Sequence, residues 1–167
     1  MSDAETAWQS WLSGLTPSKR AAAETLRTRF EALGATDAPT WVTSAIDEAQ
    51  PHLARFLLLR SLWDVAIDSW GTPGALEQIP AARRLLAAGA DRDDLLLLAR
   101  AAAYESVFAT VDTLDTGPDT DVPGIDTGWL LMESTDDGSP TGRTLDGLHE
   151  DLLTTDPSGR DGADLWQ

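Results

Sequence analysis

Charged side chains recur on two long apolar stretches of the sequence, where a charge is costly to bury. Arg60, Asp64 and Asp68 are spaced by four residues and would share one face of a helix. The second stretch also carries polar groups. The predicted cluster comprises Arg60, Asp64, Asp68, Arg100, Tyr104 and Glu105. If the two helices pack together, these groups form either a structural ion pair or the lining of a polar pocket. The pocket would make the chain a small-ligand-binding protein or an enzyme.

Aspartates crowd the segment that follows the second apolar stretch, and carboxylate oxygens are the ligands that calcium prefers. Asp119 and Asp121 match the first and third positions of the calcium-loop pattern. Pro123 occupies a ligand position, and Leu130 stands where the bidentate glutamate belongs. The sequence therefore favours a solvated acidic loop. Asp119, Asp121 and Asp126 remain candidate ligands for a divalent cation, and no cofactor is indicated.

The tripeptide Asp-Thr-Gly occurs twice, at residues 115–117 and 126–128. Aspartic-protease chemistry uses two such carboxylates about 3 Å apart that share a proton. Here both copies lie in one glycine- and proline-rich segment next to predicted helices, so the required β lobes are missing. The chain has no cysteine, no G-x-S-x-G and no phosphate-binding glycine loop. An enzyme is therefore the less favoured expectation.

Negative charge is concentrated in the last third of the sequence. The net charge is −16, and residues 111–167 hold 14 acids and two bases, which is −12 of that total. Such a surface repels nucleic acid and anionic lipid and attracts a basic protein. Trp129 stands among these acids as an apolar anchor. The predicted partner-binding residues are Trp129, Glu133, Asp136, Asp137, His149, Glu150 and Asp151.

These features favour a non-catalytic interaction module that binds a basic protein. An immunity protein against a basic toxin, or an inhibitor that presents carboxylates as nucleic acid presents phosphates, would fit. The alternative for Trp129 is that it packs the hairpin on the helices.

The sequence begins without a basic, apolar leader, so we expect a cytoplasmic protein that does not enter a membrane. Both a monomer and a homodimer are compatible with the sequence.

Helix signals dominate the first two thirds of the chain. Proline and glycine punctuation predicts helices over 4–12, 17–33, about 38–46, 51–70, 75–88 with a bend at Pro80, and 91–114. Residues 51–70 are apolar on most sides, which is typical of a central helix. Beyond them the pattern predicts a strand at 129–133, a turn at 136–138, a return strand at 143–145 and a short helix at 148–153.

The predicted fold is mainly α, a single-domain bundle of about six helices with a small C-terminal β-hairpin and an acidic loop. Residues 1–114 form the helical core. Residues 115–167 add the loop, hairpin and short helix, and these pack on the same domain because a lone hairpin is only marginally stable. We expect the tail from Asp156 to be loose apart from Leu165 and Trp166, which pack back on the body.

Overall fold

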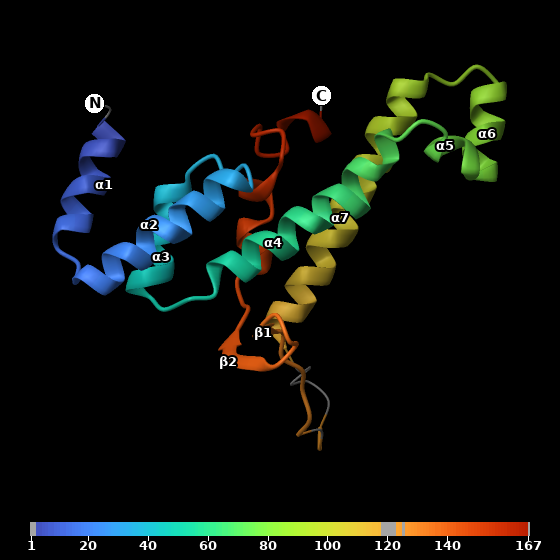
Figure 1. Cartoon of the computed structure of the whole chain (residues 1–167). Helices are drawn as coiled ribbons and strands as arrows, with labels where there is room; N and C mark the ends of the chain where they lie inside the picture. The colour runs from blue at the N-terminus through green and yellow to red at the C-terminus, as the bar shows by residue number, and fades with distance from the viewer. Residues whose placement is uncertain (1–2, 118–122, 125, 167) are drawn as a thin grey trace.

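A computed structural model of the chain describes residues 3–117, 123–124 and 126–166 (Figure 1). The first three helices are α1 (Asp3–Ser13), α2 (Pro17–Ala32) and α3 (Ala38–Asp47). Proline supplies the first helical residue of α2 and an early residue of α3, and both helices begin at a side-chain cap. Thr16 accepts from the Lys19 amide, and Asp37 accepts from the Thr40 amide.

The predicted central helix over 51–70 is one continuous helical path with three geometries. It begins as α4 (His52–Leu62), widens to a π-helical turn η1 (Trp63–Ile67), and tightens to a 3₁₀ turn η2 (Asp68–Gly71). Two short helices then form a corner, α5 (Ala75–Gln78) and α6 (Pro80–Ala87), and Pro80 separates them as the sequence predicts.

The longest helix, α7 (Arg92–Thr116), begins at its Asp91 cap and runs back beside α4 (Figure 1). It ends two residues later than the sequence predicts. A two-stranded antiparallel sheet follows, in which β1 (Met132–Ser134) pairs with β2 (Pro140–Thr144), and Met132 lies opposite Thr144. The strand predicted over 129–133 therefore begins only at Met132.

The C-terminal segment folds as short turns on the helical body. It contains α8 (Leu148–Asp151) and the 3₁₀ turns η3 (Leu153–Thr155) and η4 (Ala163–Leu165). The tail is more ordered than its glycine-rich sequence predicts. The buried Asp156 carboxylate accepts from the amides of Ser158 and Gly162. Leu165 is fully buried, whereas Trp166 is exposed and touches Tyr104 edge-on.

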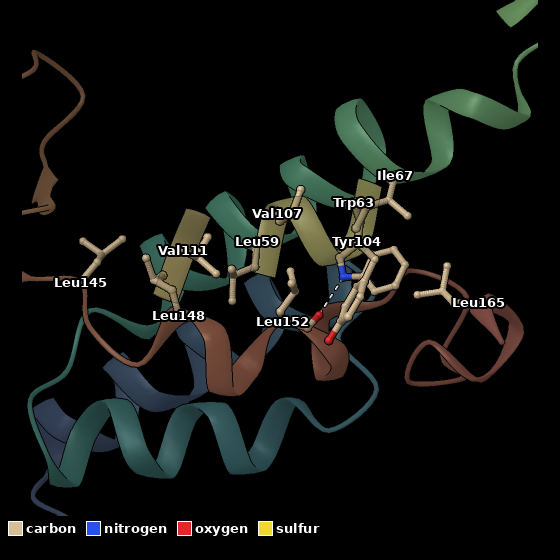
Figure 2. Close-up of a cluster of buried hydrophobic side chains, with 10 residues drawn as sticks. All are labelled: Leu59, Trp63, Ile67, Tyr104, Val107, Val111, Leu145, Leu148, Leu152 and Leu165. Carbon is tan, nitrogen blue, oxygen red and sulfur yellow. Dashed lines mark hydrogen bonds between the residues drawn. The ribbon is translucent and has the colours of Figure 1, made fainter. Parts of the chain in front are cut away.

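Two hydrophobic clusters hold these elements together. One lies among the first helices and includes Trp8, Phe30, Val42 and Phe56. The other is sandwiched between α4–η1, α7 and the C-terminal segment, as Figure 2 shows. Its centre is Trp63, which is fully buried and donates its indole N–H to the Leu152 carbonyl at 2.7 Å. Residues of the two long helices and of the C-terminal segment thus share one core.

The expected fold class, mainly helical with a small C-terminal hairpin, is confirmed. The described residues contain eight α-helices, because the bent fifth helix counts as two and the predicted short helix near residue 150 as another. Within the described part of the chain, no helix combines the length and the apolar character needed to cross a bilayer.

Candidate functional site

The six residues of the predicted polar cluster do not gather around one cavity. Two of them pair, since Arg100 binds Asp68 at 2.7 Å from its guanidinium. Arg100 also forms an ion pair with Asp164 at 2.9 Å, and Arg160 forms a second ion pair with Asp164 at 2.8 Å. This network connects α7 to η2 and η4. It is the structural ion pair that the sequence offered as one reading of these charges.

The remaining members of that cluster lie elsewhere. Tyr104 is buried in the core beside Trp63, Arg60 is half-buried, and Asp64 and Glu105 are exposed. The hollow between the two long helices is lined almost entirely by apolar side chains. No member of the six lines it.

The Arg100 network is electrostatically balanced. Burial alone would lower the pKa of Arg100, but the hydrogen bonds that its guanidinium donates to Asp164 and Asp68 hold this pKa above its ordinary value. Burial would likewise raise the pKa of Asp164, and the bond from Arg100 holds it below its ordinary value. Both side chains are therefore charged at neutral pH, and their role is to join three elements.

A second polar cluster, centred on Arg55, joins the first helices to the C-terminal segment. Arg55 is 7% exposed and points from α4 to α8. It forms an ion pair with Asp151 and donates to the Gly147 carbonyl at 2.8 Å. Burial raises the pKa of Asp151 despite the opposing charge of Arg55. No local sequence pattern indicates this pair, since its members are 96 residues apart.

The Arg55 cluster extends to a serine and a histidine, but in an arrangement unsuited to nucleophilic catalysis. Arg55 donates to His52 Nδ1 at 3.4 Å, and His52 Nε2 lies 2.7 Å from the Ser44 hydroxyl. Because arginine can only donate, Nδ1 is the acceptor and Nε2 carries the proton. His52 therefore donates to Ser44 and cannot take its proton as a general base.

A cavity of about 320 Å³ opens beside this cluster, between α3 and the C-terminal segment. Trp41 forms one wall, and Ser44, His52 and Asp151 contribute polar atoms. Asp37, which also borders the cavity, is engaged as the α3 cap. Ser44, His52 and Asp151 are already linked through one another or through Arg55, so the cluster joins α3 and α4 to the C-terminal segment.

His149 forms a third cluster at the C-terminal end of α7. Asp115 Oδ2 lies 2.8 Å from His149 Nδ1 and accepts from the His149 backbone amide at 3.1 Å. The Asp112 carboxylate is 3.8 Å from the same Nδ1. The hydrogen bond that His149 donates to the Asp115 carboxylate raises the pKa of His149. A helix C-terminus is negative and favours a nearby cation, so protonated His149 offsets both the helix and its two aspartates. Asp115, the first residue of one Asp-Thr-Gly copy, lies within α7 and is therefore helical.

The two histidines give stability opposite dependences on pH. The raised pKa of His149 makes a contribution that is complete below about pH 6.5 and is lost as pH rises through that pKa. Burial, and then the charge of Arg55, lowers the pKa of His52. Its contribution is present above about pH 6.5 and is lost as pH falls through the lowered pKa.

We therefore expect His149→Gln to lower the melting temperature more at about pH 5.5 than at about pH 8.5. His52→Gln should show the reverse, because neutral His52 is the form that the fold accommodates. Thermal unfolding of both variants and the unsubstituted chain across this range measures the effect. Offsets that do not change with pH would contradict the assignment.

The predicted partner-binding residues fall into two groups. Some are engaged within the chain: Glu133 pairs with Arg143, Asp137 caps its own turn at the Ser139 amide, and Asp151 pairs with Arg55. His149 pairs with Asp115, and the others, Trp129, Asp136 and Glu150, are exposed. All seven lie in what we call the hairpin end, which comprises the last turn of α7 and residues 126–151, with the β1–β2 hairpin and α8 (Figure 1).

The hairpin end combines exposed apolar side chains with free carboxylates. Trp129 is 43% exposed, although its indole N–H donates to the Thr113 carbonyl of α7 at 3.3 Å. The neighbouring Leu130 is 73% exposed. Asp136, Asp146 and Glu150 are exposed, and none forms a hydrogen bond or ion pair with any described residue. Sequence reasoning missed Asp146 and Leu130, since exposure rather than residue type distinguishes them.

The candidate cation ligands remain a prediction. Asp119 and Asp121 lie outside the described residues, and Asp126 is exposed. Among the residues that the structure describes, no group of three or more histidines and carboxylates has the geometry to hold a metal ion.

No protein-family model, no curated protein and no solved structure matches this chain. What the protein does must therefore be inferred from its own geometry and charge.

Proposed function

We propose that the chain is a non-catalytic protein-binding module that takes a basic partner at the hairpin end. The observation that carries this proposal is that the hairpin end exposes the apolar side chains of Trp129 and Leu130 and also several unpaired carboxylates. Tryptophan is a favoured anchor in protein interfaces, and a charged rim around such an anchor steers the partner. This combination fits a protein partner better than a small ligand, which needs a concave site.

Local pairing leaves the hairpin end strongly negative. The only two bases of residues 111–167 are Arg143 and Arg160, and each is neutralised by a neighbouring acid, Glu133 and Asp164 respectively. The C-terminus of α7 adds its own partial negative charge. A basic protein would gain Coulomb energy here, whereas nucleic acid would be repelled.

The test uses wild type and two triple variants as baits, with the captured proteins identified by mass spectrometry. Asp136→Asn, Asp146→Asn and Glu150→Gln together remove three unpaired charges from the hairpin end. The matched control removes three exposed charges elsewhere: Glu24→Gln, Glu48→Gln and Asp64→Asn. The association rate of a captured basic protein should fall about tenfold at low salt with the first variant only.

Trp129→Ala tests the apolar half of the proposal separately. As an anchor, Trp129 should contribute at least about 2 kcal/mol, so its loss weakens affinity about thirtyfold at any salt concentration. Capture of no basic protein, or of one that binds both triple variants and Trp129→Ala as wild type does, would overturn the proposal.

A further inference from the structure

A shallow groove follows α7 and reaches the hairpin end. Three adjoining hollows form it. The middle hollow, about 400 Å³, lies between α7 and α4–η1 and shares Trp70 with the hollow beside α5–α6. It shares Thr110 with a third hollow of about 400 Å³, which Trp129 bounds. We call the three together the α7 groove; in Figure 1, α7 follows one edge of the molecule from the α5–α6 corner to the hairpin.

The length and floor of the α7 groove match a helix. From Leu98 to Leu114, both of which line it, α7 rises by about 24 Å. Between them the lining residues on α7 are mostly small: Ala99, Ala102, Ala103, Ser106, Ala109, Thr110 and Thr113. Small side chains let a second helix approach at the short end of the usual 8–10 Å separation. Trp129 bounds the groove at the hairpin end, and Trp70 lies where the middle hollow meets the one beside α5–α6.

The chemistry of the groove floor favours an apolar occupant. The hydroxyls of Ser106, Thr110 and Thr113 each donate to a carbonyl one turn earlier in α7, at 2.7–2.8 Å. Their protons are therefore not available to a ligand. Leu98 is 65% exposed in the same groove. Because the groove is open along its length, it would bury only one face of an occupant, as helix-in-groove recognition does.

Charge identifies which helix fits. Both bases of α7 form ion pairs within the chain, Arg100 with Asp68 and Arg92 with Glu77. The other exposed charges along α7 are all acidic: Asp93, Asp94, Glu105 and Asp112, of which Asp112 lies 3.8 Å from His149 Nδ1. Glu105 and Asp112 are two turns apart and flank the groove on one side. The occupant therefore needs basic residues beside its apolar stripe.

The same charges oppose a second copy of this chain. Antiparallel pairing of two α7 helices would bring Asp93 and Asp94 of one against Asp112 of the other. Parallel pairing would place each Glu105 beside its counterpart. Each copy also carries a net charge of −16. Repulsion arises in both arrangements, so a basic helix from another protein is favoured.

We infer that the α7 groove binds an amphipathic helix of a partner protein, with its apolar face on the Ala102–Ser106 floor and lysine or arginine against Glu105 and Asp112. This inference rests on the proposed function and extends it, because the groove continues into the hairpin end at Trp129. It names the structural class of the partner: a basic helix rather than a loop or a strand.

The experiment is a selection from a displayed library of random peptides of about 18 residues, which reach about 27 Å as helices. The full-length chain is the bait. We expect the selected peptides to carry net positive charge and apolar residues at a helical period. Their binding should fall at least tenfold with Ala102→Trp, which fills the floor, and should survive Ala22→Trp on the exposed face of α2.

A charge variant, Glu105→Lys with Asp112→Lys, leaves the floor intact and should also weaken binding at least tenfold at low salt. Selection of no basic helical peptide, or of peptides that bind Ala102→Trp as they bind wild type, would overturn the inference. A chain that dimerises in sedimentation equilibrium, and is made monomeric by Ala102→Trp, would assign the groove to a second copy instead. A native partner sensitive to Trp129→Ala but not to Ala102→Trp would leave the proposed function standing without the groove.

Discussion

Arg55→Met should destabilise the fold by about 3–5 kcal/mol at neutral pH, as expected when one member of a buried ion pair is removed. Arg55 is only 7% exposed, and it joins α4 to α8 through Asp151 and the Gly147 carbonyl. Methionine fills similar space but leaves the Asp151 carboxylate without its partner. The free energy of unfolding from urea titration measures this loss.

The same variant should be less impaired at acid pH. Burial already raises the pKa of Asp151 with Arg55 present, and removal of that cation raises it further. A folded-state pKa above the unfolded one contributes stability at low pH and loses it as pH rises. The deficit of Arg55→Met should therefore shrink between about pH 7.5 and about pH 5.

Two further variants test the physical reason for this loss. Adding Asp151→Asn to Arg55→Met removes the stranded charge and should recover part of the lost stability. Arg92→Met breaks the exposed pair with Glu77 and should leave stability close to wild type. A loss for Arg92→Met equal to that for Arg55→Met would contradict the role of burial.

Leu152→Ala should cost about 2–5 kcal/mol, the range for a leucine removed from a well-packed core. Leu152 lies between α8 and η3 in the C-terminal segment and is fully buried with Leu59, Trp63 and Val107 (Figure 2). The segment therefore belongs to the main core. Loss of the Leu152 side chain should destabilise the long helices as much as the segment itself.

The measurement combines urea unfolding followed by tryptophan fluorescence and by helical circular dichroism. The fluorescence comes from seven tryptophans, Trp63 of the shared core among them, and the circular dichroism comes from all the helices, of which α7 is the longest. Both probes should shift together to lower urea. Leu130→Ala, at a position 73% exposed, is the matched control and should change stability by less than about 0.5 kcal/mol. Separate transitions for the two probes would contradict a single core shared by the long helices and the C-terminal segment.

Helix positions were within reach of the sequence because local signals decide them. Proline at the start of α2, Asp91 before α7 and Pro80 between α5 and α6 act on their own few residues, whatever the rest of the chain does. Apolar periodicity likewise identified the central helix, although not its π-helical turn. That turn depends on how Trp63 and Ile67 pack against α7.

The sequence by itself determined that this chain is mainly helical and acidic, and that its negative charge lies toward the C-terminus. The tertiary structure decided which charges are free. Asp151 and Glu150 are adjacent and alike in type, yet one is paired with Arg55 and the other is exposed. The pairing of His149 with Asp115 and the course of the α7 groove also arise from contacts between elements. Local propensity acts over a few residues, whereas burial and pairing depend on three-dimensional packing, so only the folded chain separates structural charges from those available to a partner.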